Sequence, residues 1–192
     1  MTVPSTRRFR TLKRIQASAI RLAMAEGLHN ITTESIARDA EVSTRTFFNY
    51  YPYKEAAIMG PPPDYPAEAI EQFVTGRGAL IEDLHRLIAT HLRRFLDQRE
   101  LVGDMLRLSD TDPKLLALRQ SAVLSRRAQL AELLRRRLPD IRPVQADILA
   151  AAIVAATNTA TTEWALGEQD DFLQAARSNL NQILPAASLL TG

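Results

Sequence analysis

Apolar residues recur at helical spacing along nearly the whole chain, and this periodicity limits the fold more than any other feature. The seven glycines and ten prolines fall mostly between the periodic runs, and no segment alternates as a strand would. The sequence therefore predicts an all-α protein. Two short helices are expected near residues 33–40 and 44–51, and longer ones over residues 6–26, 67–75, 78–98, 100–109, 113–138, 143–167 and 170–184.

Composition argues against several classes of chemistry. The 192 residues contain no cysteine, which excludes disulfides and thiol nucleophiles, and the three histidines have no spacing that would pair them on a metal. We therefore expect no enzyme and no cofactor. No apolar stretch is long enough to cross a bilayer and none at the N-terminus has signal-peptide length, so we expect a cytoplasmic protein without membrane contact.

Charge is unevenly distributed along the chain. Residues 1–60 carry nine Lys or Arg against five Asp or Glu, whereas residues 61–192 carry fifteen against seventeen. A positive N-terminal part on a mildly acidic body indicates nucleic-acid contact, and ordinary solvated surface charge is the alternative reading.

The segment GPPPDYP, residues 60–66, interrupts the helical pattern. Proline lacks the amide donor and clashes with the preceding helical turn, so no helix crosses this segment. We therefore expect an N-terminal domain over residues 1–59, a Pro-rich linker over residues 60–66 and a larger helical domain over residues 67–192.

Two short segments before that break start in the same way. Thr32 and Ser43 each offer a hydroxyl to the free amides of a first helical turn, and each follows an apolar residue that can pack on the fourth helical position. Two short, separately capped helices joined by four residues are typical of a helix-turn-helix motif. Because such short helices are marginal alone, the first long helix has to supply their packing surface.

The second short helix divides its residues by direction. Phe47 and Tyr51, four apart, form an inward stripe, while Arg45 and Phe48 fall on outward faces. Short polar residues and an arginine at a helix N-terminus suit base edges and phosphates in a major groove. A small helical subdomain with a solvated face is the alternative, although exposed rings on so small a unit usually have a partner.

The segment GLHNITTESIARDAEVSTRTFFNYYPYKEAAI, residues 27–58, resembles the N-terminal DNA-binding domain of TetR-type (tetracycline-repressor-like) transcriptional regulators. The residues that carry the resemblance are Gly27, Thr32, Thr33, Ile36, Ala37, Ala40, Val42, Ser43, Phe47, Tyr50, Lys54 and Glu55. It implies a homodimer in which each three-helix head enters one major groove of a palindromic operator. By position it implies groove-lining roles for Thr44, Arg45, Thr46 and Phe48 and backbone contacts for Thr33, Asn49, Tyr50 and Lys54; Ser43 completes the expected DNA-binding set.

Three positions depart from the family pattern. Glu41 replaces the usual glycine of the turn, where a positive φ is expected, and an L-residue there costs on the order of 1 kcal/mol. Tyr53 replaces the small polar cap before Lys54, so the fourth helix is expected to start without a side-chain cap. That helix is also cut short by Gly60 and Pro61, which bears on how a signal would reach the DNA-binding head.

The larger domain offers a candidate dimer face. Residues 146–164 are nearly free of charge and rich in Ala and Thr, which allow close helix approach. By resemblance this helix and the last one, about residues 170–184, form a four-helix bundle with their dimer mates. A central core helix of a monomer is the alternative reading.

Periodicity alone predicts a ligand pocket in this domain. The apolar lining is expected from Ile88, Phe95, Met105 and Leu124, and the polar groups from His91, Asn158 and Thr162, each of which could instead be a satisfied interior residue. The arginines of residues 126–138 are interpreted as a solvated face, since Leu130, Leu133 and Leu134 keep the other side apolar.

These observations together predict a ligand-responsive transcriptional regulator. We expect a repressor that binds double-stranded operator DNA as a homodimer and is released by a largely apolar small-molecule effector. The alternative is an all-helical interaction or small-molecule-binding module that does not bind DNA.

Overall fold

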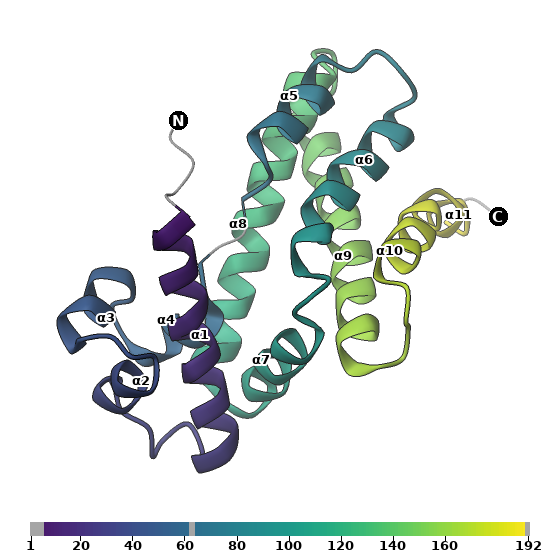
Figure 1. Cartoon of the computed structure of the whole chain (residues 1–192). Coiled ribbons are helices and arrows are strands. Elements are labelled where there is room, and N and C mark those ends of the chain that lie inside the picture. The colour runs from purple at the N-terminus through teal and green to yellow at the C-terminus, as the bar shows by residue number, and fades with distance from the viewer. Residues whose placement is uncertain (1–5, 62–63, 191–192) are drawn as a thin grey trace. The chain divides into compact units, whose positions relative to one another are not determined.

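The computed structural model describes residues 6–61 and 64–190, and every regular element in these ranges is helical (Figure 1). The predicted fold class, an N-terminal helix-turn-helix domain followed by a larger helical domain, is confirmed. The elements in chain order are α1 (Thr6–Glu26), α2 (Thr33–Asp39), α3 (Thr44–Tyr50), α4 (Lys54–Met59), α5 (Ala67–Thr75), α6 (Leu80–Leu92), the 3-10 turn η1 (Arg93–Phe95), α7 (Arg99–Thr111), α8 (Pro113–Arg137), α9 (Pro143–Leu166), α10 (Phe172–Asn181) and α11 (Ile183–Ser188).

The described residues form two compact units. The first unit comprises residues 6–61 and 100–121, and the second unit comprises residues 64–99 and 122–190. The first unit thus includes nearly all of α7 and the first nine residues of α8 in addition to α1–α4. Helix α8 continues from the first unit into the second without interruption.

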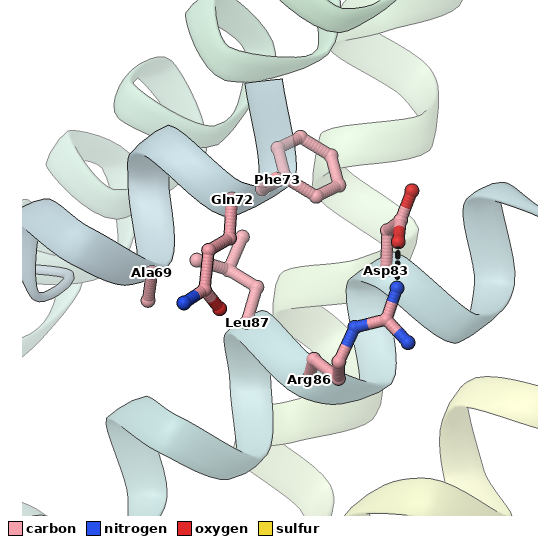
Figure 2. A pocket seen from close by; sticks show the side chains of 6 residues that line it. All are labelled: Ala69, Gln72, Phe73, Asp83, Arg86 and Leu87. Atoms are coloured by element: carbon pink, nitrogen blue, oxygen red, sulfur yellow. Dashed lines mark hydrogen bonds and ion pairs between the residues drawn. The ribbon is translucent and has the colours of Figure 1, made fainter. Parts of the chain in front are cut away.

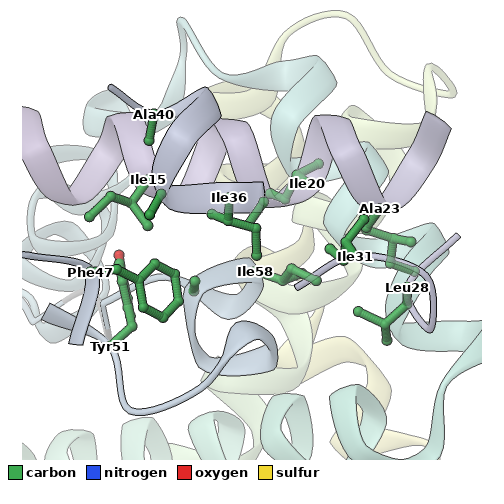
Figure 3. Packing of buried hydrophobic residues seen from close by; sticks show 14 of the residues in the cluster. Ile15, Ile20, Ala23, Leu28, Ile31, Ile36, Ala40, Phe47, Tyr51 and Ile58 are labelled. Atoms are coloured by element: carbon green, nitrogen blue, oxygen red, sulfur yellow. The ribbon is translucent and has the colours of Figure 1, made fainter. Parts of the chain in front are cut away.

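A single apolar core holds the first unit together (Figure 3). Ile15 and Ile20 of α1, Ile36 of α2, Phe47 of α3 and Ile58 of α4 are all at most 1% exposed. Complete burial of a side chain of this size contributes about 1.5–3 kcal/mol. Since α2, α3 and α4 have only six or seven residues each, this shared core rather than intrinsic helix propensity stabilises them.

The predicted N-caps of the two short helices are present. The hydroxyl of Thr32 accepts from the amide of Ser35 at 3.1 Å, and that of Ser43 accepts from the amide of Thr46 at 3.0 Å. Between them, Glu41 has φ 51°, the left-handed conformation expected at this turn. The fold therefore holds a strained residue between two capped helices.

Helix α4 starts and ends as expected from its sequence. Tyr53 stands at the N-cap without a side-chain cap bond, and the helix ends at Gly60, whose φ of 71° suits glycine. A Cβ at position 60 would overlap the side-chain amide of Gln16, which donates to the carbonyl of Ile58 at 3.1 Å. The turn therefore depends on glycine for both its conformation and its packing against α1.

Tyr53 lies beside the start of α8, a contact of this ring that the sequence did not predict. The Lys114 ammonium is 4.5 Å from the Tyr53 ring centroid and 3.1 Å from the Glu55 carboxylate. These contacts tie the N-terminus of α4 to α8 within the first unit. Because α8 continues into the second unit, they give the short α4 a connection that does not pass through the Pro-rich segment.

The second unit is built around the packing of α9 against α10, with α10 and α5 both packing on α6. Trp164 and Phe172 stack at the junction of α9 and α10 with ring centroids 4.2 Å apart. Arg99 links the start of α7 to the end of α9 and the loop that follows it. Its guanidinium donates to the carbonyl of Trp164 at 2.7 Å and to that of Gln169 at 2.8 Å.

Two of the predicted helices are divided in the structure. The helix expected over residues 78–98 ends at Leu92 and tightens into η1, where the side chain of Gln98 donates to the carbonyl of Arg94 at 2.8 Å. The helix expected over residues 170–184 stops at Asn181, and α11 starts two residues later. Pro185 explains this stop, because its ring would clash with the carbonyl four residues earlier, whereas it fits the first turn of a new helix.

Candidate functional site

Helix α3 presents one face to the core and the other to solvent. Phe47 is fully buried and Tyr51 is 4% exposed, with the Tyr51 hydroxyl donating to the carbonyl of Leu12 at 3.3 Å. Phe48, its ring packed edge-on against Phe47, is 52% exposed. The predicted division of these rings into inward and outward sets is confirmed, and it orients the rest of the helix.

Four further residues of α3 that are expected to line the groove or contact the DNA backbone lie on the same outward side. Arg45 and Asn49 are exposed, and Thr44 and Thr46 are partly exposed at the start of the helix. The hydroxyls of Ser43 and Thr46 lie 2.8 Å apart, so the cap and the first turn form one polar surface. This surface carries the donors, acceptors and ring carbon that suit a major groove.

Thr33 and Tyr50, both expected to contact the DNA backbone, lie at the start of α2 and at the end of α3 respectively. Thr33 opens α2 and its hydroxyl donates to Glu34 at 3.2 Å, while the partly exposed Tyr50 ring lies 5.8 Å from the guanidinium carbon of Arg8. Both positions suit contacts to a DNA backbone, as expected for them.

Lys54 is held differently from the other expected DNA contacts. Its ammonium donates to the carbonyl of Leu28 at 2.7 Å and to that of Ile31 at 2.9 Å. These are carbonyls of the α1–α2 connection, so Lys54 ties α4 to that connection. Lys54 therefore helps to hold the N-terminal helices together and also adds to their positive charge.

In the second unit, a buried carboxylate of α6 pairs with an arginine of α8, which also binds the segment before α6. Asp83 of α6, 3% exposed, accepts from Arg137 of α8 at 2.9 Å. It also pairs with Arg86 of its own helix, as Figure 2 shows. Arg137 also donates to the carbonyl of Gly78 at 3.1 Å. The hydrogen bond from Arg137 keeps the pKa of Asp83 below its usual range, although burial opposes this.

The cavity beside Asp83 is too small for an effector. It is lined by Ala69, Gln72, Phe73, Asp83, Arg86 and Leu87 and holds about 10 Å³, roughly the space of one water molecule (Figure 2). Since Asp83 and Arg137 neutralise each other, this cluster stabilises the fold of the second unit.

A second cluster contains His91, one of the residues predicted to contact a ligand. Its ring lies 4.8 Å from that of Tyr65 and 5.6 Å from that of Phe95, measured between centroids. His91 is 3% exposed, and its Nδ1 is buried without a hydrogen-bond partner among the described residues. Burial, reinforced by the nearby charges of Arg126 and Arg94, lowers the pKa of His91 to about 3, so the ring is neutral at physiological pH.

Arg126 brings a positive charge to this cluster. Its Nη1 donates to Oδ1 of Asn158, another predicted ligand residue, at 3.5 Å. Loss of hydration lowers the pKa of Arg126, while burial raises the pKa of the neighbouring Tyr65 to about 12 against the opposing effect of Arg126. No Asp or Glu of the described residues pairs with Arg126, whereas Arg135 and Arg137 on the same helix pair with Asp147 and Asp83.

The other residues predicted for the pocket are spread more widely. Ile88 is buried one helical turn before His91, and Thr162 is partly buried on α9 one turn after Asn158. Leu124 is 62% exposed, and Met105 belongs to the first unit, where it packs against the core. The structure therefore gathers His91, Phe95 and Asn158 with Tyr65 and Arg126, and leaves Leu124 outside.

The prediction of a solvated arginine face over residues 126–138 is wrong for two of its members. Arg127 and Arg136 are exposed, but the Arg137 side chain is only 12% exposed and Arg126 is partly buried and dehydrated. Arg126 and Arg137 lie four residues from Leu130 and Leu133 respectively, so both continue the apolar stripe of α8. Their spacing is the signal that could have identified them.

Neither a metal site nor a membrane span is found in the part of the chain that the structure describes. Within residues 6–61 and 64–190 no three His, Asp or Glu side chains gather as metal ligands would. Over the same ranges no helix combines the length and apolar character needed to cross a bilayer.

Comparison with known proteins agrees with the geometry of the first unit. The family model of bacterial regulatory proteins, tetR family, matches residues 15–56, which span most of α1 and all of α2 and α3. Comparison with curated proteins finds no match. Solved structures match nearly the whole chain.

FadR of Thermus thermophilus, a TetR family transcriptional repressor in complex with lauroyl-CoA, is 26% identical, with 90% of this chain and 93% of that chain covered and a TM-score of 0.59. A TetR-like transcriptional regulator from Rhodococcus sp. RHA1 is 20% identical, with coverages of 96% and 99% and a TM-score of 0.55. The fatty acid degradation regulator FadR from Bacillus halodurans is 18% identical, with coverages of 90% and 96% and a TM-score of 0.58, and these last two share the fold. The capped helix-turn-helix, the family model and the whole-chain matches lead to one conclusion: residues 15–56 are a DNA-binding domain of the tetR family, and the chain as a whole shares the fold of TetR family transcriptional regulators.

Proposed function

We propose that the protein is a ligand-responsive transcriptional repressor that acts in the cytoplasm and binds a palindromic operator as a homodimer. Residues 1–59 serve as the DNA-binding domain and residues 67–192 as the regulatory and dimerisation domain. The observation that carries this proposal is α3, anchored by the fully buried Phe47 and presenting Arg45, Phe48 and Asn49 outward. A short helix held this firmly by its inner face can place its outer face in a major groove.

DNA binding is tested with duplexes taken from the region upstream of the protein's own gene and of neighbouring genes. Fluorescence anisotropy should give an affinity that falls steeply with salt, because Lys and Arg displace counterions from phosphates. Tighter binding to one palindrome than to a scrambled duplex supports an operator. The absence of salt-sensitive binding to every duplex would favour the alternative of an interaction module without DNA binding.

The proposed dimer rests on the apolar side chains that α9 leaves exposed. Val144 is 56% exposed and Ile148 is 64% exposed, one turn apart on the same helix, and Ala155 further along is exposed as well. A second copy of this helix would bury them. Light scattering should give twice the chain mass of 21.4 kDa, and a stable species at the single mass would contradict the dimer.

The proposed effector site is the cluster of Tyr65, His91, Phe95, Arg126 and Asn158. Three rings supply apolar surface, and Arg126 supplies a cation that no carboxylate of the described residues neutralises. A buried, unpaired charge is costly, and a ligand with an acidic group would relieve that cost. We therefore propose an effector with an apolar body and an anionic group.

The complex of the Thermus FadR with lauroyl-CoA makes fatty acyl thioesters the first class to test. Titration of lauroyl-CoA into the protein–operator complex should lower the anisotropy of labelled DNA if this class is the effector. Coenzyme A alone is the matched control, since it has the phosphates without the acyl chain. Release by both compounds alike would argue against a specific acyl site.

A further inference from the structure

The surface between α1 and α3 is hollowed. Three residues of α1, namely Arg8, Thr11 and Arg14, face the turn and first residues of α3 across a hollow of about 530 Å³. The opposite side is formed by Ser43, Thr46 and Tyr50. This α1–α3 hollow adjoins the residues expected to enter the major groove, but no sequence pattern predicted a function for its α1 side.

The side chains of the α1–α3 hollow suit a phosphate. Arg8 and Arg14 supply two guanidinium groups, and Thr11 and Thr46 supply hydroxyls that can donate to phosphate oxygens. The Arg8 guanidinium carbon lies 5.8 Å from the Tyr50 ring centroid, a cation–π contact that keeps this charge close to the hollow. A duplex read by α3 has to run its backbone past one end of that helix.

Glu41 contradicts this chemistry, because it places a carboxylate on the same hollow. Its Oε2 is 3.9 Å from Nη1 of Arg14, with the two side chains 85% and 50% exposed. The residue also has φ 51°, a conformation in which glycine would be less strained. A charged side chain therefore stands at a position whose backbone disfavours it, directly beside the Arg14 cation of the hollow.

We infer that the α1–α3 hollow binds a backbone phosphate of DNA, and that Glu41 is an internal competitor for Arg14 that weakens this binding. The inference rests on the proposed DNA-binding function. In the free protein Glu41 partly neutralises Arg14, and on DNA a phosphate takes its place. An exposed ion pair of this kind is weak, so the exchange requires little free energy.

Because phosphate contacts carry no sequence information, Glu41 lowers affinity for all duplexes alike and reduces the time spent on non-specific DNA. It thus tunes overall affinity, while Arg45 and its neighbours on α3 set the sequence preference.

The test compares Arg14→Ala, Glu41→Gln and the double variant on an operator duplex and a scrambled duplex over a range of salt. Glu41→Gln should tighten binding about 3- to 10-fold to both duplexes at low salt, because it removes a repulsive charge beside one phosphate. Arg14→Ala should weaken binding to both and reduce the slope of log affinity against log salt by about one. In the double variant the gain from Glu41→Gln should largely disappear, since the cation it would release is gone.

Arg21→Ala is the matched control, because Arg21 lies on α1 and pairs with Asp39 outside the hollow. It should leave the salt slope unchanged. Thermal unfolding should show Glu41→Gln to be as stable as the wild type, so that a gain in affinity is not a gain in folded protein.

Wild-type binding with unchanged affinity in both Arg14→Ala and Glu41→Gln would overturn the inference and leave the proposed function intact. A gain confined to the operator duplex would also overturn it, because it would assign Glu41 to base reading. Absence of DNA binding by the wild-type chain would instead remove the proposed function itself, and this inference with it.

Discussion

The two compact units use arginine differently. In the first unit Arg14 and Arg21 of α1 and Arg45 of α3 are exposed, and Arg14 pairs with Glu41 at the surface. In the second unit Arg137 is enclosed with Asp83, and Arg126 is dehydrated beside rings and an amide. These three arginine side chains of the first unit are thus exposed to water, whereas the two of the second unit lie partly or largely inside it.

The difference shows what each charge can do. An exposed guanidinium can exchange a carboxylate for a DNA phosphate at little cost in free energy, because neither partner has to lose much of its hydration. An enclosed guanidinium with a permanent counter-charge stabilises the fold, as Arg137 does. The partly buried Arg126 has no carboxylate partner among the described residues, and we propose that it binds an anionic ligand. Four predictions test this division.

Asp83→Ala should have the largest effect on stability. It leaves the enclosed charge of Arg137 without its partner, which should lower the free energy of unfolding by about 3–5 kcal/mol. Chemical denaturation measures this change. Asp110→Ala is the control, since it breaks the more exposed pair with Arg119 and should cost at most about 1 kcal/mol; equal losses in the two variants would contradict the division.

Acidification should weaken the second unit through His91. In the folded protein the pKa of His91 is about 3, below the ordinary histidine value of 6.5, so the folded protein resists protonation. The stabilisation is complete above about pH 6.5 and should fall by up to about 1.4 kcal/mol per pH unit as the pH drops towards 3. Denaturation at pH 7, 6 and 5 measures the slope.

His91→Gln should flatten this pH dependence, because glutamine does not titrate. His29→Gln, a change at an exposed histidine of the first unit, should leave it as in the wild type. A steep slope that persists in His91→Gln would assign the acid sensitivity to another group.

Arg45→Ala should act on DNA rather than on the fold. If Arg45 contacts a base, its removal should weaken operator binding by about 1–3 kcal/mol and relax the preference at one base pair. The stability should not change, because the side chain is exposed. Arg77→Ala, an exposed arginine of the second unit with the same change in charge, serves as the control in anisotropy titrations, and equal affinity in both variants removes Arg45 from the contact set.

Arg126→Met should change the stability much less than Asp83→Ala does. Because Arg126 has no carboxylate partner among the described residues, methionine should leave the free energy of unfolding within about 1 kcal/mol of the wild type or raise it. The same variant should lose its response to an anionic effector while retaining operator affinity. A loss of stability comparable to that of Asp83→Ala would show that Arg126 is structural.

Most of the helical organisation was predictable because it depends on local pattern. The caps at Thr32 and Ser43, the inward stripe of Phe47 and Tyr51 and the uncapped start of α4 all follow from residues within one or two turns of each other. The end of α10 at Asn181 also has a local cause, because the ring of Pro185 would clash with the carbonyl of Asn181 in a continuous helix. The helix predicted up to residue 184 is therefore too long.

The candidate sites were less predictable because they combine distant segments. Nothing within one turn of Arg126 indicates that it approaches Tyr65, His91 and Asn158, which come from three other segments of the second unit. Likewise, the hollow beside α3 depends on which face of α1 packs on the core and therefore on which arginines are left outside.

The sequence by itself determined the helical class, the helix-turn-helix with its caps, and the family resemblance, because periodicity, hydroxyl caps and proline breaks act over a few residues. Tertiary structure alone decided which of the arginines on the apolar side of α8 has a carboxylate partner. Two arginines with the same spacing to apolar neighbours on α8 differ because Asp83 of α6 pairs with Arg137, whereas no carboxylate of the described residues pairs with Arg126, which donates to the Asn158 amide. Dehydration and pairing depend on segments far apart in the chain, so they are settled only when those segments pack together.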